Sequence, residues 1–179
     1  GSRDRLSEVG VAGTRTTRPR SDQLLIDGDT WTTQQLAEFV GALAGHDDTD
    51  GTVSAALEWA ARSTEAEAGA ILDAGGGTVA AIGFDGESPR VALRAVATGE
   101  ARSLHVPGVG TCHAISVPIE DDGLEHLILA RSGAPFSGEE PNLLRGVARV
   151  LALTLRTIRT MSSERELRLE SERRGAENE

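Results

Sequence analysis

The residues that could ligate a metal ion or act as nucleophiles are few in this sequence and lie far apart. The chain contains one cysteine and four histidines, and only Cys112 and His113 are adjacent. Zinc sites are built from clustered cysteine and histidine ligands, which this spacing does not provide. The chain lacks a Gly-x-Ser-x-Gly sequence, and no Ser, His and acid triad can be assigned. We therefore predict no metal site and no catalytic residues.

Three further motifs have the composition of ligand-binding loops but not their pattern. Gly75-Gly76-Gly77 lacks the Lys, the Ser or Thr and the helix start that hold phosphate. The acidic groups at 47–50 and 121–122 do not have the spacing of a calcium-binding loop. We interpret the first group as a helix cap and the second as a solvated turn.

Charge is distributed unevenly along the chain. The net charge is −10 and every one of the 18 cationic side chains is an arginine. Residues 22–161 carry nine arginines and twenty acidic residues, which gives −11. An acidic body repels nucleic acids and anionic membranes, and no apolar run approaches the ~18 residues of a membrane span. We expect neither partner, and the single cysteine is consistent with a reducing cytoplasm.

The N-terminal third predicts two helices. Residues 1–21 show no apolar periodicity, and 24–26 are interpreted as a short strand or docking segment that stops at a turn at 27–29. A helix is predicted from about Thr32, and a second helix follows the acidic cap and ends near Ser63. The apolar stripe of the first helix comprises Leu36, Phe39, Val40 and Leu43.

The rest of the chain predicts five strands and two helices. The expected strands are 68–72, 78–84, 102–106, 113–119 and 124–130. A short helix opens at Ser88-Pro89 and closes at Gly99, and a long final helix runs from about Pro141 towards Arg174. This order predicts an α+β domain with one antiparallel sheet and helices packed against it.

Four strings in this order resemble the GAF family. Ala-Thr-Gly-Glu at 97–100 is similar to its helix ending in Thr-Gly, and 114–119 resembles its strand ending in Val-Pro-Leu. The stretch 123–129 resembles its last strand, and 135–140 resembles the Phe-Thr-x-Glu-Asp that opens its final helix. The resemblance covers about residues 36–160. It implies a central antiparallel sheet of five to six strands, with N- and C-terminal helices on one face and a short helix and loops on the other.

The resemblance also implies a place for a small ligand, between the sheet and the short helix with its loops. The segment from Ser88 to Thr111 is short, so we expect any pocket to be small. The alternative is that the same residues pack together as core. The candidate pocket residues are Ile82, Leu93, Val96, Leu104, Val106, Cys112, Ala114 and Ser116.

We expect no cofactor. Bilin-binding GAF domains contain a Cys-His pair like Cys112-His113, but theirs lies earlier, in the helical segment over the chromophore. Haem-binding members need an axial histidine that faces a roomy apolar cavity, and we interpret His105 and His113 as strand residues that face solvent. The Asn-Lys…Phe…Asp-Glu signature of cyclic-nucleotide GAF domains is absent because the chain has no lysine.

Apolar residues extend around a wide arc of the predicted final helix as far as Met161. We expect one face to cover the sheet and another to need a partner. Beyond Met161 the helix is too polar to be stable alone, so we predict a two-stranded coiled coil and keep a frayed polar tail as the alternative. The residues assigned to this dimer and signalling helix are Leu151, Leu155, Ile158, Ser162, Arg165 and Leu169.

The predicted organisation is an N-terminal arm or linker at 1–31, a GAF-like domain at 32–160 and the start of a helical signalling linker at 161–179. Gly1-Ser2 resembles a tag scar. The favoured hypothesis is a cytoplasmic, non-catalytic, homodimeric sensor. It would relay a ligand or partner signal through its C-terminal helix to an output domain: a histidine kinase, a cyclic-di-GMP enzyme, a phosphatase or a transcription regulator.

Two other hypotheses stay open at this point. The first is a degenerate GAF domain that only dimerises, and a filled core in place of an enclosed apolar cavity would favour it. The second is a free-standing enzyme, which would need polar residues that converge in a cleft.

Overall fold

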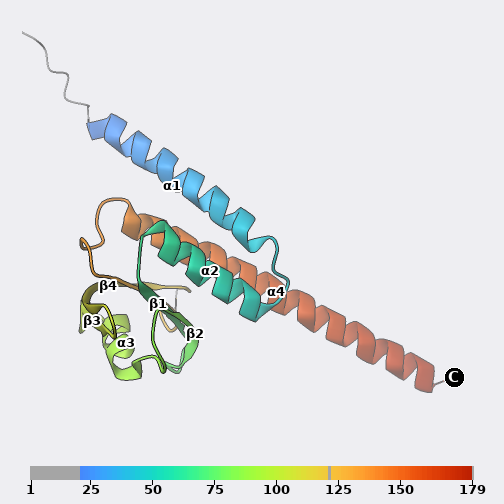
Figure 1. Cartoon of the computed structure of the whole chain (residues 1–179). Helices are drawn as coiled ribbons and strands as arrows, with labels where there is room; N and C mark the ends of the chain where they lie inside the picture. The colour runs from blue at the N-terminus through green and yellow to red at the C-terminus, as the bar shows by residue number, and fades with distance from the viewer. Residues whose placement is uncertain (1–20, 121, 179) are drawn as a thin grey trace, which may run out of the picture.

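The computed structural model describes residues 21–120 and 122–178, with side chains described from residue 30 onward. Figure 1 shows four helices and a single sheet in this part of the chain. In chain order the elements are α1 (Ser21–Leu43), α2 (Thr49–Ser63), β1 (Ala68–Leu72), β2 (Thr78–Ile82), α3 (Arg90–Ala97), β3 (Ser103–Val106), β4 (Gly110–Pro118), β5 (His126–Arg131) and α4 (Glu140–Glu177). No helix of the described residues combines the length and the apolar run that crossing a membrane requires.

The five strands form one antiparallel sheet in the order β2-β1-β5-β4-β3. The α+β prediction and the predicted antiparallel sheet are therefore confirmed. All five residues of β1 are buried, because both faces of the sheet are covered by helices. β5 is the central strand, and it pairs with β1 on one side and β4 on the other.

Two separate apolar cores lie on the two faces of the sheet. The larger core joins α1, α2 and α4 to one face, and it includes Phe39, Leu57 and Leu151. The smaller core lies under α3 on the other face, and it includes Leu93 and Val106. This arrangement confirms the expectation of N- and C-terminal helices on one face and a short helix on the other.

Local features of the sequence explain where α2 begins and where β2 ends. The Asp48 carboxylate caps α2 by accepting a hydrogen bond from the Gly51 N–H (3.3 Å), and Asp50 adds a favourable charge to the first turn. β2 ends at Ile82, two residues before the predicted end at Phe84. The reason is Gly83, whose φ of 77° lies in the left-handed region, and an added Cβ there would lie 2.0 Å from the Glu67 carbonyl oxygen.

The first helix differs from its prediction. α1 begins at Ser21, so the backbone at 24–26 and at the expected turn 27–29 is helical, and the helix starts well before Thr32. The sequence assigns residues 1–31 to an arm or linker, but residues 21–31 of that segment belong to α1. The remainder of the predicted arm, 1–20, lies outside the described residues. The Asp27-Gly28 pair lies inside the helix and does not form the predicted turn, because an isolated glycine is tolerated inside a helix.

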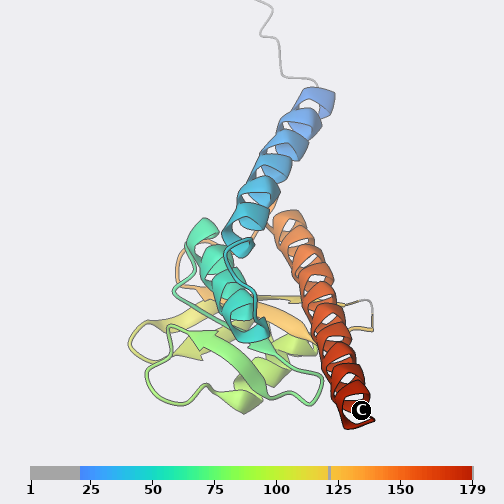
Figure 2. The same cartoon turned by 90° about the vertical axis from the view of Figure 1, so that its right-hand side faces the viewer.

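α1 and α4 lie side by side and run in the same direction (Figures 1 and 2). They approach closely at Gly146, where an added Cβ would lie 2.9 Å from a methyl carbon of Leu36. From there the two helices leave the domain at opposite ends, α1 with its N-terminal end and α4 with its C-terminal end.

Candidate functional site

The predicted pocket residues lie mostly in the small core under α3. Leu93 and Val96 of α3, Leu104 and Val106 of β3, and Cys112 of β4 are all buried there, and Ala114 packs against them half-buried. These side chains fill the space between α3 and the sheet with one another. They form a buried layer of the smaller core.

Ile82 was placed on the wrong side of the sheet. It packs with Ala80 against the larger core, on the face covered by α2. Side chains alternate across a strand, so Ala80 and Ile82 share one face of β2. The sequence pattern of an edge strand such as β2 does not reveal which set of alternate residues points to which helix.

An open depression lies beside this packed layer, at the C-terminal end of α3. Its volume is ≈ 400 Å³. Ser116 is one of its lining residues, and the Ser116 Oγ is buried and has no hydrogen-bond partner within the described part of the chain. A buried hydroxyl without a partner is costly. The lining residues are Val96, Ala97, Thr98, Gly99, Ala101, Arg102, Ala114, Ile115 and Ser116.

Cys112 is a free, buried thiol. Its Sγ lies 3.7 Å from the Gly110 carbonyl oxygen, and burial raises the pKa of the thiol above its ordinary value. Because the thiolate is the nucleophilic form, this environment suits a structural cysteine. In the described part of the chain, no three His, Cys, Asp or Glu side chains come close enough to hold a metal ion.

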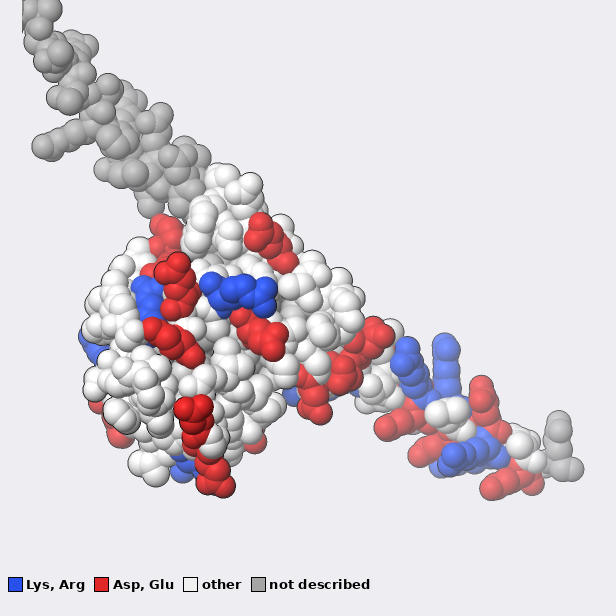
Figure 3. Space-filling model, in the orientation of Figure 1, with Lys and Arg blue, Asp and Glu red and all other residues white. Residues whose placement is uncertain are grey.

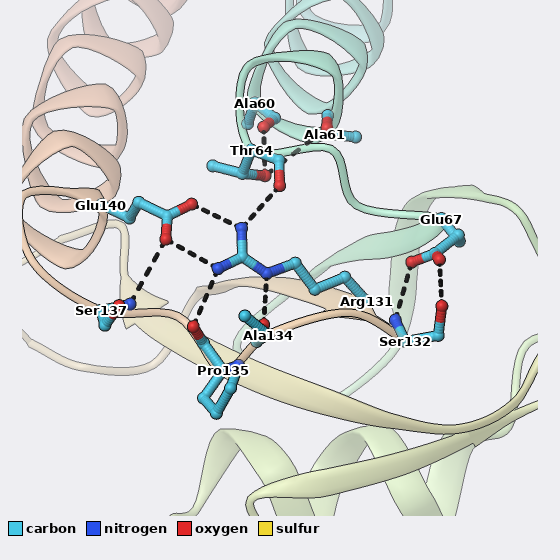
Figure 4. Close-up of polar contacts among 10 residues, drawn as sticks. All are labelled: Ala60, Ala61, Thr64, Glu67, Arg131, Ser132, Ala134, Pro135, Ser137 and Glu140. Atoms are coloured by element: carbon cyan, nitrogen blue, oxygen red, sulfur yellow. Dashed lines mark hydrogen bonds and ion pairs between the residues drawn. The ribbon is translucent and has the colours of Figure 1, made fainter.

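The most extensive polar contacts of the described residues surround Arg131, at the C-terminal end of the central strand (Figure 4). Its Nη1 donates to the Thr64 carbonyl oxygen at the end of α2 (2.8 Å). Its Nε and Nη2 donate to the carbonyl oxygens of Ala134 and Pro135 (2.7 and 2.9 Å). Its guanidinium also lies over the Phe136 ring, 4.2 Å from the ring centroid.

Arg131 also binds the first residue of α4. Its Nη1 and Nη2 donate to the two carboxylate oxygens of Glu140, at 2.5 and 2.7 Å. This bidentate hydrogen bonding lowers the pKa of the Glu140 carboxyl and raises the pKa of Arg131. Both side chains are largely buried, so the pair is shielded from solvent. The start of α4 is thereby tied to the central strand and to the end of α2.

The loop between β5 and α4 has a second polar anchor. The Glu67 carboxylate accepts hydrogen bonds from the backbone N–H of Ser132 (2.9 Å) and from its hydroxyl. These bonds lower the pKa of Glu67. Sequence reasoning missed both Arg131 and Glu67. Glu67 binds Ser132, 65 residues away, and Arg131 joins Thr64, 67 residues away, to nearby Ala134, Pro135 and Glu140. The only local signal was the string at 135–140, which contains Glu140.

The outward surface of α4 divides into two sectors between residues 142 and 160. At 3.6 residues per turn, four arginines fall within about 80° of the helix circumference. An adjoining sector of about 80° carries no charged residue. The arginines are Arg145, Arg149, Arg156 and Arg159, and the uncharged sector comprises Asn142, Gly146, Val150, Leu153, Thr157 and Thr160.

The residues of α4 that were predicted for the dimer and signalling helix differ in their exposure to solvent. Leu151 and Leu155 are 0% and 4% exposed, packed in the chain's own core, so they are unavailable to a second copy. Placing them at the interface was wrong because their stripe faces α2 and the sheet. Ile158 is half-buried, and Ser162, Arg165 and Leu169 are exposed.

Other apolar side chains of the two helices also face solvent. Val40 of α1 is 51% exposed, Leu153 of α4 is 56% exposed and Met161 is 49% exposed. Exposed apolar residues that lie on adjoining helices mark a candidate contact surface. We call Val40, Leu153, Thr157 and Met161 the uncharged face.

Comparison with known proteins identifies the fold. No protein-family model matches the chain, and a search of curated proteins found no match. Among solved structures, the chain is similar to the GAF domain of a putative sensor histidine kinase from Pseudomonas syringae pv. tomato. The identity is 18% and the TM-score 0.53, over 79% of this chain and 96% of that one.

It is also similar to the GAF domain of a phosphoenolpyruvate-protein phosphotransferase from Acinetobacter. Here the identity is 11% and the TM-score 0.53, over 73% of this chain and 95% of that one. The chain therefore has the fold of a GAF domain.

Proposed function

We propose that this chain is a non-catalytic regulatory module that dimerises through α1 and α4 and passes a signal along α4 to an output domain. One observation carries the proposal: every residue from Arg159 to Glu177 in α4 is exposed. Most helical stability in proteins comes from packing of an apolar face, and this stretch has no such packing within its own chain. It becomes stable when a second helix pairs with it.

The uncharged face is the surface we assign to the second copy. A face without charges avoids the cost of burying unpaired ions between two copies. Val40 and Leu153 supply apolar area on both helices, and a two-fold axis along the helices would bring α1, α4 and their copies into one bundle. The projecting part of α4 would continue this pairing. The predicted Ser162, Arg165 and Leu169 lie about 120° around the helix from Leu153, Thr157 and Met161, so they fall outside the uncharged face.

The Arg131 cluster supports a route for the signal. α4 begins at Glu140, which Arg131 holds against the end of the central strand. A change in the sheet therefore acts on the start of α4 through short charge-assisted hydrogen bonds. The relatives with the same fold include a domain of a sensor histidine kinase, and we extend a regulatory role of that class to this chain.

Sedimentation of matched variants tests the dimer. Val40→Glu places a charge on the uncharged face, and Val91→Glu places the same charge on α3, where Val91 is 86% exposed. We expect the first variant to weaken the dimer at least about tenfold and the second to leave it unchanged, because only the first would bury a charge. A monomeric wild-type chain, or equal effects of both variants, would remove the proposal.

The ligand site we propose is the depression beside Ser116, in place of a cavity within the packed layer. Ser116→Ala removes the unpartnered hydroxyl, so the variant should gain about 1 kcal/mol in free energy of unfolding. Chemical denaturation measures this gain, with Ser103→Ala on the exposed surface of β3 as the control. Native mass spectrometry of wild type and variant then shows whether a small molecule is retained through Ser116.

A second function is favoured by the filled core under α3. Since Leu93, Leu104 and Val106 are fully packed, the domain would also serve as a dimerisation scaffold without any ligand. The two candidates differ in one result. Retention of a small molecule by wild type, and its loss in Ser116→Ala, supports the sensor, whereas a dimer that retains nothing supports the scaffold.

A further inference from the structure

The arginine sector of α4 borders a groove that shares only Leu153 with the uncharged face. The groove has a volume of ≈ 450 Å³ and lies between α4 and the end of β4. Figure 2 shows the ends of β4 and β5 beside α4, on the side away from α2. Its lining residues are Pro118, Ile119, Glu120, Arg145, Arg149, Ala152, Leu153 and Arg156.

The three arginines of the groove lack acidic partners. Over residues 30–120 and 122–178, the single ion pair is Arg131–Glu140, and Arg145 donates only to the neighbouring Asn142 side chain (2.9 Å). Clustered, unpaired guanidinium groups are unexpected in a chain of net charge −10. Figure 3 shows carboxylates spread over the visible face of the domain, with a few arginines among them.

A second copy of the chain does not fit this strip. A two-fold axis parallel to α4 that brought the strips together would place Arg149 and Arg156 opposite their own copies. Like charges across an interface cost several kcal/mol. The uncharged face and the arginine strip therefore take different partners, although they meet at Leu153.

The spacing of the arginines indicates a chain-like ligand rather than a small anion. Along the helix axis, Arg145 and Arg149 are about 6 Å apart, and Arg156 is about 10 Å farther on. A single phosphate or carboxylate can reach two neighbouring guanidinium groups but not all three. A segment with several carboxylates, in extended or helical form, matches the whole strip.

The apolar part of the groove indicates that this segment is a polypeptide. Among the apolar lining residues, Ile119 and Ala152 are buried in the larger core, and Leu153 is exposed. Leu153 is therefore the residue that suits an apolar side chain of the partner. Nucleic acid offers phosphates without such a side chain, and the acidic body repels it. Glu120 on the opposite wall places the partner's carboxylates on the α4 side of the groove.

We infer that the groove between α4 and the end of β4 binds an acidic segment of a partner protein, with carboxylates on Arg145, Arg149 and Arg156 and an apolar residue beside Leu153. The inference stands apart from the dimer, because the groove exists in a single chain. It gives the domain a second interaction surface on the helix that we propose to carry the signal.

Fluorescence anisotropy with a designed helical peptide tests the inference. The peptide's glutamates repeat the spacing of the three arginines, with one leucine between the second and third. A second peptide has glutamine in place of each glutamate. We expect the acidic peptide to bind, the glutamine peptide to bind at least about tenfold more weakly, and added salt to weaken binding because it screens exposed charges.

Matched variants identify the surface. Arg149→Glu/Arg156→Glu should weaken acidic-peptide binding more than about tenfold, since two attractive pairs become repulsive. Arg90→Glu/Arg173→Glu makes the same change in net charge away from the groove and should leave binding within about twofold. Circular dichroism checks that every variant folds, and Leu153→Ser, which keeps the arginines, should show an intermediate loss.

Several results would overturn the inference. They are no binding of the acidic peptide, equal losses in the two double variants, equal affinity for the glutamine peptide, or equally tight binding of a single-stranded RNA oligomer. Sedimentation of the same samples reports the dimer separately. Failure of the groove and failure of the proposed dimer are therefore distinguishable.

Discussion

The two halves of α4 have similar lengths but opposite environments. From Glu140 to Ile158 the helix packs against α1, α2 and the sheet, whereas from Arg159 to Glu177 every residue is exposed. The first half is held by buried leucines and by the Arg131 anchor. The second half has the backbone hydrogen bonds of the helix and two hydrogen bonds from side chains to backbone, in which Thr160 and Ser163 donate to the carbonyl oxygens of Arg156 and Arg159. One continuous helix can therefore be both part of a core and a projecting arm.

The largest expected effect is on the free energy of unfolding, and it appears when the same leucine-to-alanine substitution is made in each half of α4. Leu151→Ala removes a fully buried side chain, and it should lower the free energy of unfolding by about 3 kcal/mol. Leu167→Ala lies on the projecting half, where Leu167 is 67% exposed, and should change it by less than about 0.5 kcal/mol. Urea denaturation at equal protein concentration measures both, and similar losses would show that the projecting half also packs within the folded chain.

The next effect concerns the anchor at the start of α4. Arg131→Met leaves Glu140 and the Thr64 carbonyl oxygen without their partner, and we expect a loss of about 2 kcal/mol because the site is partly shielded from solvent. Hydrogen exchange should rise in the first turns of α4 and stay unchanged beyond Arg159. Arg145→Met, which removes an arginine of α4 itself, is the control. Equal effects of Arg131→Met and Arg145→Met would contradict the anchoring role.

The smallest effect is a pH dependence confined to the anchored half. The pKa of Glu140 is lowered in the folded protein from its ordinary value of 4.5. Its stabilisation is therefore fully present above that value and is lost as the pH falls through the lower folded pKa. Wild type should lose more stability below about pH 4.5 than Glu140→Gln does. Glu166→Gln, on the projecting half, should follow the wild-type curve, and acid denaturation profiles that coincide for all three would contradict the prediction.

Much of the fold could be predicted from local patterns. The short apolar run at 68–72 and the helical period at 144, 147, 151 and 155 are patterns that are set within a few residues. These patterns located every strand and helix to within a few positions, apart from the start of α1. There the Asp-Gly pair at 27–28 suggested a turn, and the backbone is helical.

The candidate site was less predictable, because it depends on which faces meet. Ile82 and Cys112 look equally suited to a pocket in the sequence, yet they lie in different cores. From the sequence, Leu151 and Leu155 could pack either against a second copy or against the sheet. In the structure they are buried in the larger core, on the sheet side. Arg131 binds Glu140 nine residues on, but its contact with Thr64 joins positions 67 residues apart, and no local pattern predicts that contact.

By itself, the sequence determined the order and type of the elements, the acidic character of the body and the polar end of α4, because each is a property of neighbouring residues. Only the tertiary structure decided which stripe of α4 is buried, that Ser116 lies at the open depression, and that Arg131 holds the start of α4. Those outcomes follow from contacts between distant segments, and the energy of such contacts exists only once the chain has packed.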